Sequence, residues 1–109
     1  MEERRKYLRA DVSFPVECDL LTQNNYFYTV CKDLCLGGIK ILSNKFISKD
    51  NILKININFI DEVLRLKAKV IWCNRKRVSD RYVIGLEFIE LNVSNQKNIQ
   101  RFLNKVQPS

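Results

Sequence analysis

The stretch Lys32-Asp33-Leu34-Cys35-Leu36-Gly37-Gly38 contains two of the three glycines of this 109-residue chain, side by side. Paired glycines allow positive backbone φ angles and let another group approach the chain closely. An aspartate often opens a turn because its side chain bonds to the backbone that follows it. We therefore expect a turn over residues 33–38 that joins two strands and carries a carboxylate, that of Asp33, at its mouth.

A basic N-terminal segment supplies charges opposite to that carboxylate. Arg5 and Arg9 are four positions apart, a spacing that directs two side chains the same way in a helix and also in an extended strand. Guanidinium groups bind phosphates through charge-assisted hydrogen bonds, and a carboxylate accepts hydrogen bonds from N–H donors. Two arginines and Asp33, brought together by folding, would suit a ligand that has phosphates and a hydrogen-bonding ring.

Apolar and polar residues alternate on both sides of the expected turn, which is the pattern of half-buried β-strands. In residues 64–72 the alternation places Trp72 on the inner face and the cations Arg65, Lys67 and Lys69 on the outer face. Gly85 lies inside an expected strand, where glycine often marks a bend or a close approach. Strands are expected over residues 12–20, 26–32, 39–42, 53–59, 64–72 and 82–88.

The period of the apolar residues changes near the C-terminus. Ile99, Phe102, Leu103 and Val106 recur at helical spacing, and Ser94 is a candidate N-cap. Six strands and one such helix predict a mostly β fold, a small six-stranded antiparallel β-barrel with a C-terminal amphipathic helix. Residues 1–10 are expected to form a flexible basic arm, and residues 11–109 to form the barrel domain.

Composition narrows the classes of function. The net charge of +7 favours anionic partners. The chain has no histidine, and its four cysteines form no Cys-x-x-Cys pair, so neither a metal site nor catalytic residues are expected. No apolar run is long enough for a signal peptide or a membrane span. We expect a cytoplasmic protein with reduced cysteines and no cofactor.

Several of these residues together resemble the motifs of the PilZ domain family. Arg5-x-x-x-Arg9 matches its first motif, and Asp33-x-Cys35-x-x-Gly38 matches its second. A strand opening with Pro15-Val16 and the later segments 70–72 and 84–88 also resemble that family. The chain departs from the pattern at Cys35, where the family has serine.

The resemblance implies a bacterial receptor for cyclic di-GMP that passes this second-messenger signal to an effector protein, which the sequence does not identify. Arginine matches the acceptor pair of guanine and also its phosphates, while a carboxylate can accept from the opposite guanine edge. Arg4 precedes the first motif at a position where a basic residue accompanies an intercalated pair of ligands. Trp72 could line the site, although a tryptophan on an inner face more often belongs to the core. The candidate ligand-binding residues are Arg4, Arg5, Arg9, Asp33, Cys35, Gly37, Gly38 and Trp72.

Two alternatives remain open. The chain could be a PilZ-fold adaptor that binds protein without nucleotide, with Cys35 as the sign of a lost site. It could also be a small basic barrel that binds single-stranded nucleic acid along Arg65, Lys67 and Lys69. The second alternative is weaker because no aromatic residue is interleaved with those cations.

Overall fold

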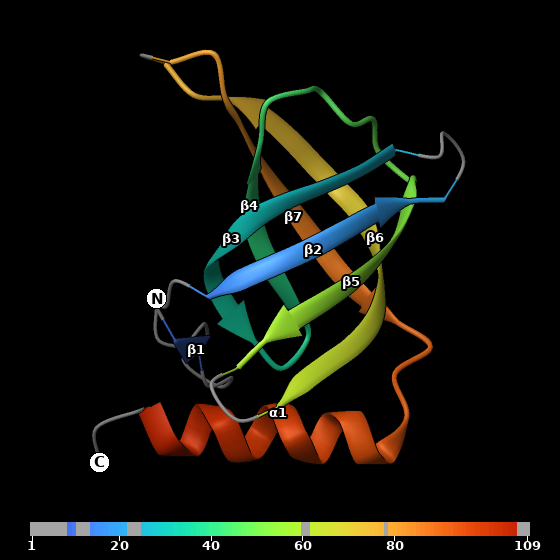
Figure 1. Cartoon of the computed structure of the whole chain (residues 1–109), viewed down its shortest axis with the longest axis vertical. Helices are drawn as coiled ribbons and strands as arrows, with labels where there is room; N and C mark the ends of the chain where they lie inside the picture. Colours follow the sequence, from blue (N-terminus) through green and yellow to red (C-terminus); the bar gives the residue numbers. More distant parts are fainter. Residues whose placement is uncertain (1–8, 11–13, 22–24, 60–61, 78, 107–109) are drawn as a thin grey trace.

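A computed structural model describes residues 9–10, 14–21, 25–59, 62–77 and 79–106 of the chain. Within them, seven strands precede one helix (Figure 1). Their bounds are β1 Arg9–Ala10, β2 Pro15–Leu20, β3 Asn25–Cys35, β4 Gly38–Ser43, β5 Ile52–Asn58, β6 Val63–Arg75, β7 Tyr82–Ile89 and α1 Val93–Val106.

Six of the strands close into an antiparallel barrel, as the sequence predicts. Their order is β3-β2-β5-β6-β7-β4, and pairing of β3 with β4 completes the circle. The short β1 pairs with the end of β3, so the last two residues of the predicted arm are part of the sheet. The rest of that arm, residues 1–8, lies outside the described residues.

The barrel is filled by the inward side chains of its strands. Val16, Cys18 and Leu20 of β2 are buried while the residues between them are not, as a period of two requires. Burial raises the pKa of the Cys18 thiol to about 12. It also raises the pKa of the Cys31 thiol to about 12. All four cysteines are free.

Helix α1 lies across one end of the barrel (Figure 1). Its residues Ile99 and Leu103 are fully buried. The ring of Phe102 stacks on Phe59, with 4.3 Å between centroids, and meets Phe14 edge-on at 5.1 Å. Within the described residues, no helix has the length and the apolar character that crossing a membrane would need.

The prediction that Ser94 caps this helix is wrong. The side-chain oxygen of Asn92 accepts a hydrogen bond from the backbone N–H of Asn95, at 2.7 Å, so Asn92 is the N-cap. The helix begins at Val93 and Ser94 lies in its first turn. An N-cap side chain accepts a hydrogen bond from the backbone N–H of the second or third helical residue. Asn95 is the third residue of a helix that begins at Val93, so its partner Asn92 is the cap.

The prediction of a turn over residues 33–38 is also corrected. Strand β3 continues to Cys35 and β4 begins at Gly38, so only Leu36 and Gly37 lie between the two strands. Neither glycine has a positive φ. The expected turn is short because Leu34 and Ile39 pair across the strands, which extends the ladder nearly to the glycines.

Candidate functional site

A bulge in β3 determines which of its side chains face outward. The pairing with β4 shifts between Cys31 and Asp33, so Lys32 is an extra residue in the strand. Cys31 and Leu34 are both buried although three positions separate them. The extra residue therefore reverses the alternation, and Asp33 and Cys35 lie on the outer face of the barrel.

A second bulge has the same effect in β6. The pairing with β7 shifts between Val70 and Trp72, leaving Ile71 exposed. Val70 is buried, and beyond the bulge it is Cys73 that packs against the core. The expectation that Trp72 continues the inner face is therefore wrong. The bulge turns its side chain outward.

The two bulges create a row of residues across four neighbouring strands. Asp33 pairs with Lys40, Lys40 with Gly85, and Gly85 with Trp72. The Lys40 ammonium lies 3.5 Å from the Asp33 carboxylate. A Cβ at Gly85 would collide with the indole ring of Trp72. The glycine therefore provides the flat backbone on which the ring lies, and the close approach expected at Gly85 is confirmed.

The paired glycines have different surroundings. A Cβ at Gly38 would collide with the carbonyl oxygen of Leu86, whereas one at Gly37 would meet open space. The carbonyl of Gly37 accepts a hydrogen bond from the N–H of Phe88 at 3.0 Å. Gly38 is thus needed for the approach of β4 to β7, while Gly37 contributes backbone at the edge of the site.

These residues line one pocket of about 640 Å³ on the outer face of the barrel. Five of the predicted ligand-binding residues belong to its lining: Asp33, Cys35, Gly37, Gly38 and Trp72. The volume lies within the usual range for small-molecule sites, roughly 300–1,000 Å³.

The first motif reaches the second through β1. Arg9 pairs with Cys35 in register, and Ala10 pairs with Leu34. The backbone of Arg9 is thus beside the second motif. Arg4 and Arg5 lie outside the described residues.

Sequence reasoning missed other lining residues, among them Lys40, Ile71 and Glu87. Lys40 could have been found from the hairpin, because a strand pair with a short connection places it opposite Asp33. Ile71 follows Val70, and two adjacent apolar residues in an alternating strand are a signal of a bulge. Glu87 pairs with Gly38, and no sequence pattern indicates that pairing.

Comparison with known proteins relates this geometry to one family. A family model described as the PilZ domain matches residues 3–105. No curated protein matches the chain. Among solved structures, the PilZ domain of Escherichia coli YcgR with c-di-GMP is 19% identical, with a TM-score of 0.79, over 94% of this chain and 91% of that one.

Two larger proteins contain the same fold. The Bacillus subtilis inhibitor of motility MotI/DgrA is 19% identical, with a TM-score of 0.78, over 94% of this chain and 50% of that chain. Full YcgR in complex with c-di-GMP is 20% identical, with a TM-score of 0.80, over 94% of this chain and 46% of that chain. This chain therefore spans about half the length of either protein, and at such identities the similarity concerns the fold.

Proposed function

The chain belongs to the PilZ domain family, and from this premise we propose that it is a receptor for cyclic di-GMP that transmits the signal to a partner protein. The observation that carries the proposal is the joining of the two motifs. Asp33, Cys35, Gly37 and Gly38 line one pocket, and Arg9 is in register with Cys35 at its edge.

Each part of the ligand has a matching group in this proposal. Arg4, Arg5 and Arg9 bind the phosphates and the acceptor edge of guanine. The Asp33 carboxylate accepts from the N–H donors on the opposite guanine edge. The Trp72 ring offers an apolar face against which a base can stack.

Lys40 influences how the ligand reaches Asp33. In its ion pair with Asp33, 44% of the Lys40 side chain is accessible but only 14% of the Asp33 side chain. The carboxylate therefore needs a hydrogen-bonding partner when the ammonium leaves. The N–H donors of a guanine supply one, and the released cation stays near the ligand phosphates.

The substitution of the family's serine by Cys35 should weaken binding without preventing it. A thiol is a weak hydrogen-bond donor, and losing one hydrogen bond to a charged group costs roughly 1.5–3 kcal/mol. That cost corresponds to about a tenfold to hundredfold loss of affinity. The arginines and Asp33 supply the remaining binding energy.

Titration calorimetry with cyclic di-GMP tests the proposal, with GTP and linear diguanylate as controls. We expect heat with the cyclic dinucleotide only, and a loss of at least about tenfold in affinity for Arg9→Ala or Asp33→Ala. Absence of heat and of chemical-shift changes at millimolar ligand would contradict the receptor function.

In that event the second candidate, an adaptor that binds protein without nucleotide, would take its place. The specific observations in its favour are the ion pair between Lys40 and Asp33 and the cysteine at position 35. The ion pair occupies the Asp33 carboxylate, and the cysteine replaces a serine hydroxyl. The ligand would use both of these groups.

A further inference from the structure

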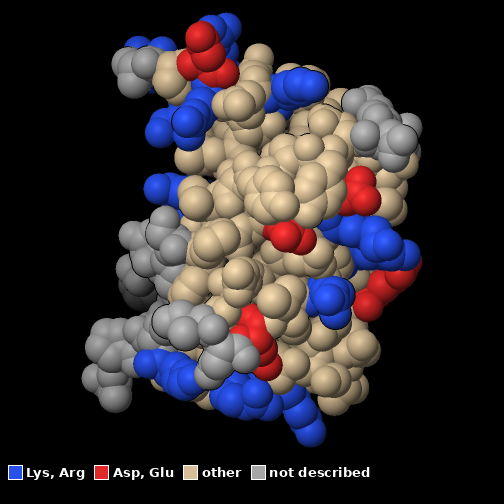
Figure 2. All heavy atoms as spheres, in the orientation of Figure 1, with Lys and Arg blue, Asp and Glu red and all other residues tan. Residues whose placement is uncertain are grey.

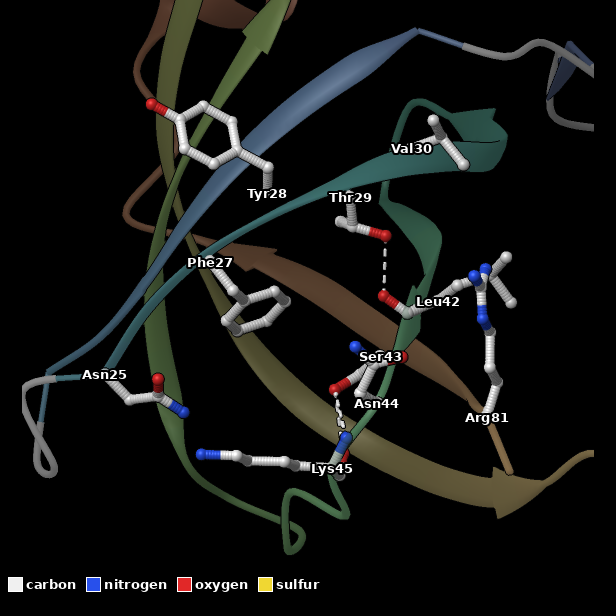
Figure 3. A pocket seen from close by; sticks show the side chains of 10 residues that line it. All are labelled: Asn25, Phe27, Tyr28, Thr29, Val30, Leu42, Ser43, Asn44, Lys45 and Arg81. Carbon is white, nitrogen blue, oxygen red and sulfur yellow. Dashed lines mark hydrogen bonds between the residues drawn. The ribbon is translucent and has the colours of Figure 1, made fainter.

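A second concavity lies between the beginning of β3 and the end of β4. It has a volume of about 370 Å³ and shares no lining residue with the 640 Å³ pocket that contains Asp33 and Trp72, which we call the dinucleotide pocket after its proposed ligand. Figure 3 shows its side chains, which come from β3, from the end of β4 and the residues after it, and from Arg81 just before β7. We call it the β3–β4 cleft.

The cleft exists because the β3–β4 ladder stops early. The pair of Cys31 with Ile41 is its last rung in this direction. Across the described residues, no ladder pair connects Asn25–Val30 with β4. The Thr29 hydroxyl instead donates a hydrogen bond to the Leu42 carbonyl at 2.6 Å (Figure 3). A side chain thus bridges the two strands where their backbones have separated.

The separation leaves one edge of β3 with backbone groups directed into the cleft. The other edge is fully paired with β2, and the N–H of Cys31 donates to the Phe14 carbonyl on that side, at 2.8 Å. In an antiparallel ladder successive residues direct their backbone groups to opposite edges. The N–H and C=O groups of Tyr26 and Tyr28 therefore face the cleft.

The rim of the cleft is aromatic and basic. Tyr28 is 70% exposed beside the edge. Lys45 reaches toward Asn25, and Arg81 stands on the side of Leu42 (Figure 3). None of the described lining residues is acidic. The cleft therefore favours an occupant with negative charge.

We propose that the β3–β4 cleft binds a short, extended, acidic segment of a partner protein, which adds as a strand to the free edge of β3. A paired edge supplies main-chain hydrogen bonds and the neighbouring side chains supply specificity, as in other cases of strand addition. A peptide has alternating N–H and C=O groups that match this edge, whereas a nucleic acid does not. The cleft is thus an output surface separate from the dinucleotide pocket.

Selection from a displayed library of random short peptides, with and without cyclic di-GMP, provides the probe. We expect the selected peptides to be acidic and to lose at least about tenfold in affinity for Lys45→Glu/Arg81→Glu. The matched control, Lys97→Glu/Arg101→Glu, changes the net charge equally on the exposed side of α1 and should leave the affinity within about twofold. Equal losses in both variants would overturn the proposal.

Amide hydrogen exchange tests the mode of binding. In the bound protein, the N–H groups of Tyr26 and Tyr28 should become protected, while those of Phe27 and Thr29, which face β2, should change little. Protection without this alternation would overturn strand addition. Binding of oligothymidine that Lys45→Glu/Arg81→Glu abolishes, with no acidic peptide selected, would instead identify the cleft as a nucleic-acid site.

Cyclic di-GMP titration of Lys45→Glu/Arg81→Glu separates this proposal from the receptor function. The variant should retain dinucleotide affinity, because neither residue lines that pocket. If the variant binds the dinucleotide normally and loses the peptide, the cleft binds the peptide and takes no part in dinucleotide binding. Loss of both would contradict two separate sites.

Discussion

The indole ring of Trp72 lies against the backbone of Gly85 on the outer face of the barrel, so closely that a Cβ at residue 85 would collide with the ring. The two residues are paired in the β6–β7 ladder. Trp72 is only partly buried, so its ring can move towards solvent when a larger residue replaces Gly85. Gly85 therefore controls the position of one wall of the proposed dinucleotide pocket.

Gly85→Ala should displace the Trp72 ring and lower cyclic di-GMP affinity by about tenfold, with a loss of roughly 1–2 kcal/mol in the free energy of unfolding. Indole fluorescence reports the displacement, and calorimetry the affinity. Gly37→Ala is the matched control. A Cβ there meets open space, so we expect little change in stability. Unaltered fluorescence and affinity in Gly85→Ala would exclude a role for the Trp72 ring.

Cys35→Ser should tighten cyclic di-GMP binding by a few-fold to about thirtyfold, because a hydroxyl donates a stronger hydrogen bond than a thiol. Cys35 is half-buried on the outer face, so stability should change little. Cys31→Ser in the same strand is the control. Cys31 is fully buried, and an unpaired hydroxyl there should cost roughly 1–3 kcal/mol. Lower stability of Cys35→Ser with unchanged affinity would remove Cys35 from the site.

The buried cysteines predict a loss of stability at high pH. Burial raises the pKa of Cys18 and Cys31 from 9.0 to about 12. A raised folded-state pKa means that stability is fully present below about pH 9 and declines as pH rises toward 12. Urea unfolding between pH 8 and pH 11 measures the decline, which Cys18→Ala/Cys31→Ala should reduce. An equal decline in this variant would assign the effect to other groups.

Replacement of Arg65, Lys67 and Lys69 together by Gln should leave cyclic di-GMP affinity within about threefold. None of the three lines the proposed dinucleotide pocket. Lys67 is paired with Glu90 at 3.3 Å, and Arg65 lies by a separate concavity with Glu17 and Asp19. Calorimetry at two salt concentrations measures the affinity of this variant for cyclic di-GMP. A large loss at both concentrations would mean that the ligand binds on the face of these cations.

The sequence alone determined the architecture of this protein. Alternation along each strand follows from the two-residue period of the extended chain, and the stripe containing Ile99 and Leu103 follows from the helical period. Both patterns are local, so they can be identified without knowing any neighbour. The second motif, by contrast, is identified by the resemblance of Asp33, Cys35 and Gly38 to the pattern of the PilZ family.

The tertiary structure decided which face several of these residues occupy. A bulge depends on the register of a strand with its neighbour, and one extra residue reverses every side chain beyond it. The bulge near Lys32 turns Asp33 and Cys35 outward, and the bulge at Ile71 does the same for Trp72. Adjacent apolar residues such as Val70 and Ile71 can signal a bulge, but which residues pair beyond it depends on the partner strand. The motif residues were therefore predictable from the sequence, whereas the pocket that joins them depends on pairing across four strands.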